Sequence, residues 1–317
     1  MNRPTNLESY SRYGSNMTNR ASRRRSLEAQ RQAFAYFLIT PAVLMLIVFM
    51  VYPLFNALVL SLYQWNGFGS KIFIGFENFV GLFRDPRFFN ALGNTLKYTV
   101  GSVFGTLLIG FLTALALHIK IKGWRFFRTA FFMNVILSIT AVGILWGNLL
   151  HPIGGPVKLV LKLVGITAPD WFGNPSLVMW VITAINIWQY SGYPMLFLFT
   201  AMESIPTEMY EAAEIDGITF WKKVWYLILP MIKPVLAIVT MLQVINSFKV
   251  FDVVFVITKG GPGQASEVLS LYMYNVAFWF RRFGYGSAIS VIMLMLEMIL
   301  AWFYLRAVRF EQAPDEG

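Results

Sequence analysis

Long apolar stretches alternate with short polar loops along most of the chain. Six of these stretches lie at about residues 35–62, 95–117, 128–150, 177–202, 232–257 and 287–306. Because a helix needs about 20 mostly apolar residues to cross about 30 Å of hydrocarbon, each stretch predicts one transmembrane helix. Pro41 and Pro53 lie inside the first stretch and predict a kink or a break there. The pattern therefore predicts an all-α membrane protein with six transmembrane helices.

The composition supports a membrane protein and excludes several kinds of site. Hydrophobic residues make up 57% of the 317 residues and charged residues only 13%, whereas soluble domains carry about 25% charged residues. The absence of cysteine excludes disulfides, zinc–thiolate sites and thiol nucleophiles. The two histidines, His118 and His151, are too few for a histidine-rich metal site. We therefore expect this chain to bind no metal and no cofactor.

The distribution of Lys and Arg among the loops predicts the orientation of the chain in the membrane. The tail 1–34 holds seven Lys and Arg residues, and loops 118–127 and 203–231 hold further ones. The longer loops 63–94 and 151–176 carry fewer Lys and Arg residues for their length. Cytoplasmic loops carry an excess of Lys and Arg, so both termini and loop 203–231 are expected in the cytoplasm. The net charge of +10 follows from these loops and does not predict nucleic-acid binding.

The spans divide the chain into four regions. They are a cytoplasmic basic tail (1–34), the first transmembrane helix with an extracytoplasmic loop (35–94), a transmembrane core (95–306) and a cytoplasmic C-terminal tail (307–317). Loop 258–286 carries Lys259, Arg281 and Arg282, which weakens the charge contrast between the two sides. The basic tail is polar and is expected to be disordered, and it could also lie on anionic lipid.

No motif of an ATP-consuming or hydrolytic enzyme occurs in the chain. There is no G-x-x-x-x-G-K-[ST], and the nearest glycine-rich stretch, Gly260 to Ser266, lacks the lysine that would reach a phosphate. Neither H-E-x-x-H nor G-x-S-x-G occurs, and no loop is long enough to fold as a catalytic domain. Transport against a gradient would therefore draw its energy from a partner protein or from an ion gradient.

The loop between the fourth and fifth spans is unusually acidic for so apolar a chain. Its stretch "SIPTEMYEAAEIDG" predicts a short helix capped by Ser204 or Thr207, with Gly217 in a left-handed conformation after its end. A second short helix is expected over residues 219–227, before Pro230 opens the fifth span. The loop is therefore expected to be a structured helix–turn–helix.

One face of the first of these helices suits a docking surface. Ala212 and Ala213 present little bulk, and Glu208, Glu211 and Glu214 place carboxylates on adjoining parts of one face. This shape and charge fit a partner groove with basic residues. A solvated amphipathic connector would carry the same pattern.

The stretch from Glu211 to Pro230 resembles the EAA loop of binding-protein-dependent ABC importer permeases. It contains Glu211-Ala212-Ala213, then Gly217, then Leu227 where isoleucine is usual, and then Leu229-Pro230. Residues 76–99, 187–217 and 247–262 are similar to the carbohydrate-uptake branch, which includes maltose, multiple-sugar and glycerol-phosphate permeases. The resemblance leaves out only the N-terminal tail and the last few residues.

This resemblance implies a type I ABC importer permease fold in a bacterial or archaeal cytoplasmic membrane. It implies a second, usually different permease subunit, two ATPase subunits that bind the ATP, an extracytoplasmic solute-binding protein and surrounding lipid, with no nucleic acid. In the family, the EAA helix enters a cleft of the ATPase, where the loop glutamate pairs with a basic residue. The residues that this assigns to ATPase coupling are Glu211, Ala212, Ala213, Asp216, Gly217, Leu229 and Pro230. The chain itself would be a transporter subunit and not an enzyme.

Polar residues within the fourth and fifth spans mark either a solute path or a helix interface. Gln243, Ser247 and Val250 fall on one face of a helix, and amides, hydroxyls and aromatic rings suit a sugar. The family's sugar site lies on these two helices, and the resemblance therefore supports a solute site there. The expected solute-binding residues are Asn186, Gln189, Tyr190, Tyr193, Gln243, Asn246, Ser247 and Val250. Hydrogen bonding between helices is the alternative role for each.

Two charged residues, Lys249 and Asp252, lie toward the end of the fifth span. They are three apart and are expected to pair with each other, which would lower the cost of their burial. Alternatively, Lys249 attracts an anionic solute such as a glycerol phosphate. An ion-coupled secondary transporter would need these two residues as its relay, and a permease for amino acids or peptides would share the EAA loop. The function that the sequence favours is import of a sugar or oligosaccharide.

Overall fold

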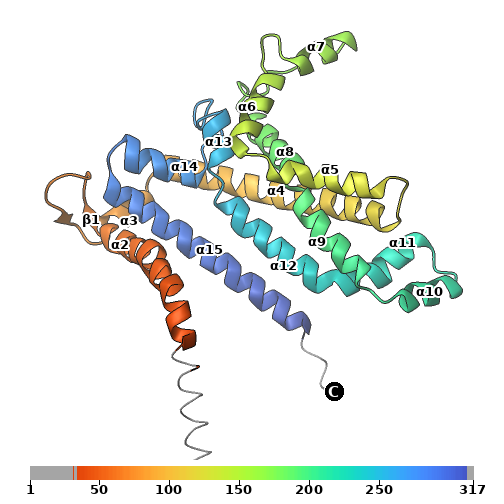
Figure 1. The fold of residues 1–317 in the computed structure, drawn as a ribbon. Helices are drawn as coiled ribbons and strands as arrows, with labels where there is room; N and C mark the ends of the chain where they lie inside the picture. Colours follow the sequence, from red (N-terminus) through yellow and green to blue (C-terminus); the bar gives the residue numbers. More distant parts are fainter. Residues whose placement is uncertain (1–30, 32–33, 313–317) are drawn as a thin grey trace, which may run out of the picture. The chain divides into compact units, whose positions relative to one another are not determined.

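The computed structural model describes residue 31 and residues 34–312. The described chain is helical almost throughout (Figure 1), and its two strands, β1 (Tyr63–Gln64) and β2 (Ile72–Phe73), pair antiparallel. The expectations for the tail 1–30 lie outside the described residues. The chain divides into two compact units, Met1–Val59 and Leu60–Gly317.

The described part of the first unit lies within one apolar helix, Phe34–Leu60, which is long enough to cross a membrane. Its middle is the π-helical segment η1 (Ile47–Val51), and α2 (Tyr52–Leu60) follows directly. Pro53 has no N–H to donate to the carbonyl of Phe49, which lies in η1. The π turn accommodates this missing bond, so the helix continues through the proline instead of breaking there.

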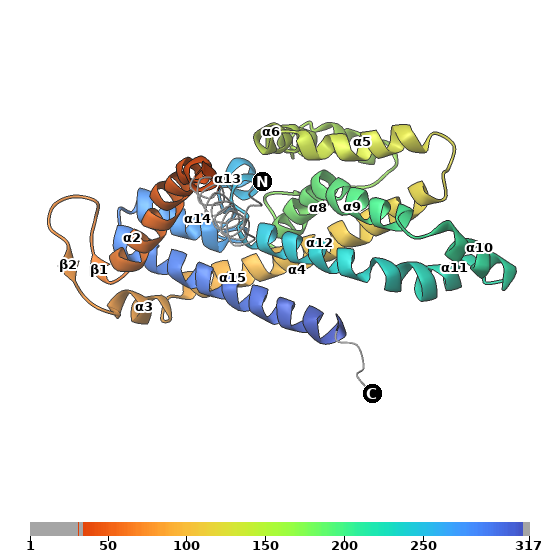
Figure 2. The same cartoon turned by 60° about the horizontal axis from the view of Figure 1, so that its bottom comes forward.

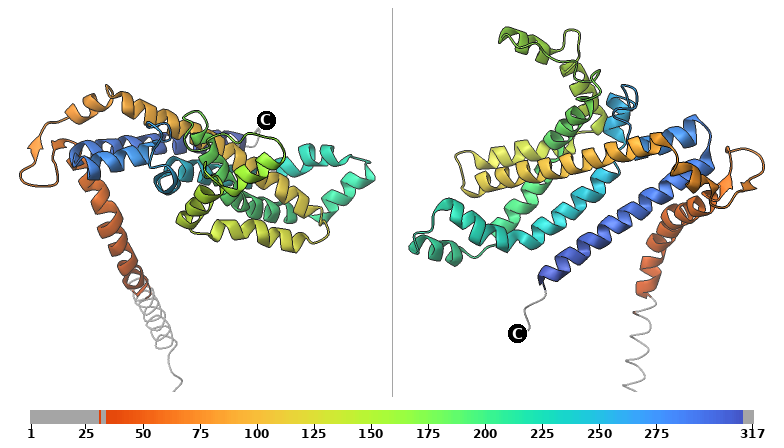
Figure 3. Two further views of the ribbon diagram at one scale, coloured as in Figure 1. Left: turned by 90° about the horizontal axis from the view of Figure 1, so that it is seen from above. Right: turned by 180° about the vertical axis from the view of Figure 1, so that it is seen from behind.

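The second unit is built around the long helix α4 (Pro86–His118). The other long helices are α5 (Trp124–Ile136), α6 (Ile139–Leu149), α8 (Val178–Tyr190), α9 (Gly192–Glu203), α12 (Leu229–Phe248) and α15 (Phe283–Gln312). The shorter segments are α3 (Glu77–Leu82), α7 (Pro156–Leu163), α10 (Thr207–Ile215), α11 (Phe220–Lys223), α13 (Asp252–Ile257), α14 (Leu269–Tyr274), and the π-helical η2 (Val224–Ile228) and η3 (Asn275–Trp279). Helix α4 packs along α8, α9 and α12 (Figures 1 and 3).

Small residues on α4 let it approach its neighbours closely. A Cβ added at Gly110 would lie 2.6 Å from Cγ of Pro194 and 2.9 Å from the backbone nitrogen of Met195. Glycine is therefore required where α4 meets the beginning of α9, as is common between membrane helices. The core beyond this contact is apolar, with Leu198 and Ile232 at most 1% exposed.

The described residues contain four helices that are long and apolar enough to cross a membrane. These are Phe34–Leu60, Pro86–His118, Phe220–Ile257 and Phe283–Arg306. A fifth is present if the pair α5 and α6 counts as one span. The expectation of six transmembrane helices is therefore not confirmed, although the chain is a multi-pass helical membrane protein.

The third predicted span is a bent pair instead of one helix. Helices α5 and α6 meet at an angle of 100°, because Leu137 and Ser138 between them adopt extended backbone conformations. The carbonyl of Leu137 accepts a hydrogen bond of 3.0 Å from Nε2 of Gln189. A side chain from another helix thus satisfies a carbonyl that the break releases from the helical pattern.

The fourth predicted span is divided between α8 and α9, with Ser191 between them. Pro194 cannot donate a hydrogen bond to the carbonyl of Tyr190, four residues earlier, so the ladder is interrupted there. The fifth predicted span, 232–257, differs from the structure at both ends. Helix α11 continues through η2 into α12 without a loop, and Lys249 to Phe251 separate α12 from α13. Pro230 stands in the first turn of α12, as expected.

Candidate functional site

A cavity of about 520 Å³ opens between α4, α8, α9, α12 and α13. Seven of the eight expected solute-binding residues line it: Asn186, Tyr190, Tyr193, Gln243, Asn246, Ser247 and Val250. Sequence reasoning missed other lining residues, among them Tyr98, Ser102, Phe197 and Phe251. Two of these, Tyr98 and Ser102, come from α4, and no pattern in the sequence places that helix beside the fourth and fifth spans.

The break between α12 and α13 shapes one side of the cavity. Helix α12 ends at Phe248, and Asp252 begins α13. The hydroxyl of Ser270 donates a hydrogen bond to the carbonyl of Val250, which lies within the break. The side chain of Val250 is 9% exposed and belongs to an apolar core cluster. The irregular backbone is thus held by hydrogen bonds, including that from Ser270 and one from the Val250 N–H to the carbonyl of Ser247, and by packing, at a place where it borders a cavity.

The amide of Gln243 serves both roles that the sequence left open. Its Nε2 lies 3.0 Å from Oγ1 of Thr106, which itself donates to the carbonyl of Ser102 at 2.7 Å. Gln243 therefore links α12 to α4 and also lines the cavity. Among the described residues, no group is hydrogen-bonded to the side-chain amides of Asn186 and Asn246. These two amides retain their full capacity to bind a solute.

Aromatic rings supply the apolar part of the cavity wall. The rings of Tyr193 and Phe197 are stacked, with centroids 6.2 Å apart and planes 12° apart. Tyr193 is 47% exposed, so one face of this pair is open. A flat aromatic face beside free amides suits the alternating CH and hydroxyl surfaces of a sugar ring.

Gln189 is the expected solute-binding residue that does not line the cavity. Its side chain is fully buried, and its Nε2 bonds the Leu137 carbonyl at the bend between α5 and α6. Its Oε1 has no hydrogen-bond partner among the described residues. Gln189 lies one helical position away from the cavity-facing side of α8, and the sequence could not distinguish the two sides.

The expected pair of Lys249 with Asp252 is wrong. Nζ of Lys249 lies 3.3 Å from Oε2 of Glu297, a residue of α15. The expectation assumed a continuous helix, in which residues three apart are neighbours, but α12 ends at Phe248. The signal for Glu297 was present in the sequence as a lone acid within the sixth apolar stretch.

The loop 203–231 contains the expected helix, α10, and the expected left-handed glycine follows the end of this helix. Gly217 has φ +66°, and its N–H bonds the carbonyl of Glu214 at 3.0 Å. The N–H of Ile218 bonds the carbonyl of Ala213 at 3.0 Å, which completes a Schellman motif. The expected side-chain cap is wrong, because Pro206 occupies the N-cap position and no side chain caps the helix. The proline fixes the entry of the chain in place of a capping hydroxyl.

One side of α10 faces the body of the protein and the other side is open. Ala213 is 6% exposed, and the hydroxyl of Tyr210 donates to the carbonyl of Met202 at 3.1 Å. Burial raises the pKa of Tyr210 to about 12, and the charge of Glu203 adds to this shift. The exposed residues here include Glu211, Ala212 and Ile215 on α10 and Asp216 and Gly217 just after its end.

A single surface ion pair joins the two helices of this loop. Nζ of Lys223 lies 2.8 Å from Oε1 of Glu214. The hydrogen bond and the charge of Lys223 lower the pKa of the exposed Glu214 carboxyl. Of the residues expected to couple to the ATPase, Leu229 is half-buried and Pro230 is exposed at the start of α12.

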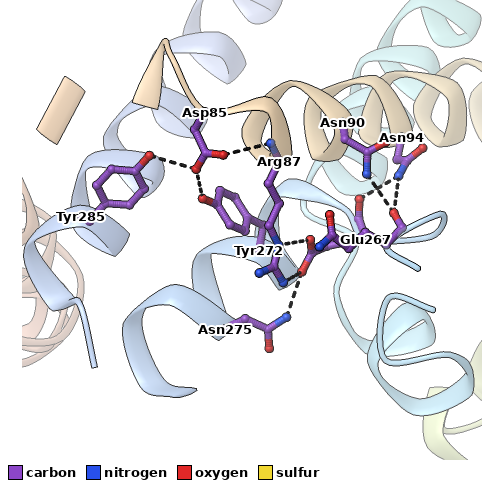
Figure 4. Close-up of polar contacts among 9 residues, drawn as sticks. Asp85, Arg87, Asn90, Asn94, Glu267, Tyr272, Asn275 and Tyr285 are labelled. Atoms are coloured by element: carbon purple, nitrogen blue, oxygen red, sulfur yellow. Dashed lines mark hydrogen bonds and ion pairs between the residues drawn. The ribbon is translucent and has the colours of Figure 1, made fainter. Parts of the chain in front are cut away.

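A buried polar network lies at the opposite end of α4, and sequence reasoning missed it. We call it the Arg87 network; its members are Asp85, Arg87, Asn94, Glu267, Tyr272, Asn275 and Tyr285 (Figure 4). The guanidinium of Arg87 bonds both carboxylate oxygens of Glu267, each at 2.7 Å, and Glu267 is 2% exposed. Nδ2 of Asn275 donates to the same carboxylate at 3.0 Å.

Asp85 is the second carboxylate of the Arg87 network and the N-cap of α4. It accepts the backbone N–H of Arg87 at 2.9 Å and the hydroxyls of Tyr272 and Tyr285. Burial would raise the pKa of Asp85, but these hydrogen bonds outweigh burial and hold the pKa below its ordinary value. The sequence Asp85-Pro86 carried the signal for a helix start, with an acid as N-cap and proline as the first helical residue.

The turn 258–268 is bound to this end of α4. The amides of Asn90 and Asn94 donate to the carbonyl of Gln264 at 2.9 and 3.1 Å. Within the turn, the hydroxyls of Thr258 and Ser266 are 2.7 Å apart. The glycine-rich stretch that lacks a phosphate-binding lysine therefore has its backbone fixed by hydrogen bonds to a neighbouring helix.

These features define a class of protein. Within the described ranges no group of three His, Asp or Glu side chains is placed to hold a metal, and the cavity is lined in part by α4 and α12, which belong to segments long enough to cross a membrane. The class is that of multi-pass membrane transport proteins with a solute-sized cavity between their helices. The chain belongs to the family of binding-protein-dependent transport system inner membrane components, which matches residues 106–309.

Relatives of known description are permease subunits of transport systems and not enzymes. The probable ABC transporter permease protein YurN of Bacillus subtilis (strain 168) is 34% identical over 250 residues, covering 77% of this chain and 85% of the relative. The lactose transport system permease protein LacF of Rhizobium radiobacter is 34% identical over 257 residues, covering 80% of this chain and 86% of the relative. The sn-glycerol-3-phosphate transport system permease protein UgpA of Salmonella typhi is 31% identical over 243 residues, covering 75% and 81%.

A solved structure shares the fold. The crystal structure of a bacterial ABC transporter involved in the import of the acidic polysaccharide alginate matches with a TM-score of 0.81 at 22% identity. The match covers 92% of this chain and 100% of the other. At this identity the match shows the fold alone, which is that of an ABC importer permease.

Proposed function

We propose that this chain is the membrane-spanning permease subunit of an ATP-driven, binding-protein-dependent importer for a sugar or oligosaccharide. The observation that carries the proposal is the cavity, which is lined both by the free amides of Asn186 and Asn246 and by the stacked rings of Tyr193 and Phe197. Relatives named for lactose, arabinooligosaccharides and starch degradation products support a saccharide. The match to an alginate importer supports the fold that such transport requires.

The proposed importer has more subunits than this chain. Two ATPase subunits would bind and hydrolyse ATP, and a second permease, usually a different chain, would complete the path. An extracytoplasmic binding protein would deliver the solute, as the family description and a solved complex of the alginate transporter with its periplasmic protein suggest. Both termini and loop 203–231 would lie in the cytoplasm.

Loop 203–231 is the proposed contact with the ATPase. Glu211, Ala212, Asp216 and Gly217 form an open surface on α10, and Ala213 and Tyr210 attach α10 to the core. Because α11, η2 and α12 follow one another without a loop, a displacement of α10 would be passed along one helical path to the cavity. The polar side chains of α12 that line the cavity, including Gln243, would then change position.

The test of this function is uptake by the assembled importer in proteoliposomes. Alanine in place of Asn186 and Asn246 should raise the KM for the transported saccharide about tenfold or more, because each change removes hydrogen bonds to the solute. Thr240→Ala is a matched control, since Thr240 lies on α12, bonds the carbonyl of Leu236 and does not line the cavity. Unchanged KM and solute preference in the double variant would contradict the assigned site.

A glycerol-phosphate importer is a second candidate function. A relative named for sn-glycerol-3-phosphate is 31% identical, and Lys249 places a cation on the cavity. Family membership argues against the third possibility, an ion-coupled secondary transporter. Competition between a neutral saccharide and sn-glycerol 3-phosphate for uptake distinguishes the first two.

A further inference from the structure

Two charged side chains line the cavity, and a third contacts one of them. Among the described lining residues, Lys249 and Asp252 are the charged ones. Lys249 is paired with Glu297, which lies on α15, is not among the residues that line the cavity and has a side chain 14% exposed. The side chain of Lys249 is 58% exposed, so the cation is open to the cavity while its partner is largely covered.

The pair depends on the packing of two helices that are distant in sequence. Helices α12 and α15 run side by side (Figure 2), and Lys249 follows the last residue of α12. Nζ of Lys249 and Oε2 of Glu297 are 3.3 Å apart, a distance at which opposite charges largely cancel for any third charge farther away. The cation of Lys249 is therefore neutralised by a residue that itself does not line the cavity.

Asp252 has no corresponding partner. In the part of the chain that the structure describes, its side chain has neither an ion pair nor a hydrogen bond. One lysine and two carboxylates thus stand at or next to the cavity, and the excess charge is negative. A negatively charged solute would meet this excess at short range inside the cavity, where like charges repel.

We infer that Glu297 is a specificity-determining residue that cancels the cation of Lys249, so that the cavity accepts uncharged saccharides and rejects anionic ones. This inference rests on the proposed function and names its solute class: neutral sugars, and not uronic acids, aldonic acids or sugar phosphates. Glu297 acts by an electrostatic effect through Lys249 and not by touching the solute. Without its charge, Lys249 becomes a free cation facing the cavity, which would attract an acid.

The test measures equilibrium binding to the assembled permease–ATPase complex in nanodiscs without the binding protein, so that the binding protein's own selection plays no part. The probes are two matched pairs of equal size: maltitol with maltobionate, and lactitol with lactobionate. In each pair a neutral hydroxymethyl group is replaced by a carboxylate. The measured quantity is the ratio of the affinities for the acid and for the neutral member.

The wild-type complex should bind a neutral member and bind its acid at least about tenfold more weakly. Glu297→Gln keeps the length and hydrogen-bonding capacity of the side chain but removes its charge, and should raise the ratio about tenfold. Glu297→Asp keeps the charge and should leave the ratio near the wild-type value. Lys249→Met combined with Glu297→Gln removes the cation as well and should abolish the increase.

Three results would overturn the inference while leaving the proposed function intact. In the first, Glu297→Gln binds the neutral probes but leaves the acid-to-neutral affinity ratio unchanged. In the second, the ratio rises in Glu297→Gln and stays raised in the double variant. In the third, Glu297→Gln weakens binding of the acid and of the neutral probe equally. If Glu297→Gln does not assemble, Lys249→Met provides the second arm. It leaves two carboxylates, so it should strengthen binding of 1-amino-1-deoxymaltitol relative to maltitol, and an unchanged ratio would also overturn the inference. Failure of the wild-type complex to bind either neutral probe would instead contradict the proposed saccharide function.

Discussion

The Arg87 network and loop 203–231 both carry acidic residues, but they use them in opposite ways. In the Arg87 network, Glu267 is 2% exposed and receives bonds from Arg87 and Asn275. In loop 203–231, Glu211 and Asp216 are exposed, and the one ion pair between the loop's helices joins Glu214 to Lys223 at the surface. The first region satisfies its charges within the chain, and the second leaves most of its own available.

This difference separates a structural role from a binding role. A buried carboxylate is stable only when its hydrogen-bonding capacity is filled, so the Arg87 network contributes to the fold and has little left for a ligand. An exposed acidic helix with small residues contributes little to the fold and can be contacted by another protein. Substitutions in the two regions should therefore affect different measurements.

The largest effect on stability is expected from Glu267→Ala. This change leaves the guanidinium of Arg87 without its carboxylate and should cost about 3–5 kcal/mol of folding stability. Thermal unfolding of the assembled complex measures it, with Glu208→Ala as a control that also removes one acid, from the exposed α10. Equal melting temperatures for the two variants would show that the network does not hold this end of α4 in place.

A smaller effect, dependent on pH, is expected from Asp85→Asn. The pKa of Asp85 in the folded protein lies below its ordinary value of 3.8, so its stabilising effect is present above that value and is lost as the pH falls through the folded pKa. Asparagine should cost about 1 kcal/mol of folding stability near neutral pH, because its amide nitrogen cannot accept the hydrogen bonds that one carboxylate oxygen accepts from Tyr272 and Tyr285. Below pH 4 the variant and the wild type should converge in thermal stability, and a constant difference down to pH 3 would contradict the assigned hydrogen bonds.

Gly217 allows the comparison to be tested inside the loop. Because Gly217 has a φ of +66°, Gly217→Ala should lower the folding stability by about 1 kcal/mol. Gly217→Asn should lower it less, because asparagine tolerates this conformation. We expect melting of the complex to change little in either variant, while ATP-dependent uptake falls in the alanine variant and is largely retained with asparagine. Equal uptake by the two variants would show that the left-handed conformation of Gly217 is not needed for coupling to ATP hydrolysis.

The smallest effect is expected from Glu214→Gln. The side chain of Glu214 is 71% exposed, and its bond to Lys223 is screened by water and salt. We expect no measurable change in melting temperature and a modest change in uptake at most. A large loss of thermal stability would mean that the loop's surface charges hold its fold.

Local signals predicted the features that depend on neighbouring residues. The helix α10, the left-handed Gly217 and the position of Pro230 follow from short-range rules of helix ends. The polar face of the fifth span also predicted most of the cavity lining, because residues three and four apart on one helix share a face.

Features that depend on distant residues could not be predicted. Arg87 and Glu267 are 180 residues apart, and Glu297 lies 48 positions beyond Lys249, so neither pair has a local pattern. The bend between α5 and α6 occurs without proline or glycine and is accompanied by the bond from Gln189 on α8. Its position therefore depends on packing and not on the local sequence.

Loop 203–231 is proposed to couple this permease to ATP hydrolysis by a partner. The most direct measurement is ATP-dependent uptake and ATP hydrolysis by the reconstituted importer with Glu211→Ala, compared with Glu208→Ala on the same helix. Because Glu211 is exposed, we expect unchanged melting of the complex together with a loss of about tenfold or more in coupled uptake for Glu211→Ala alone. Wild-type uptake and hydrolysis in the Glu211→Ala importer would contradict the claim.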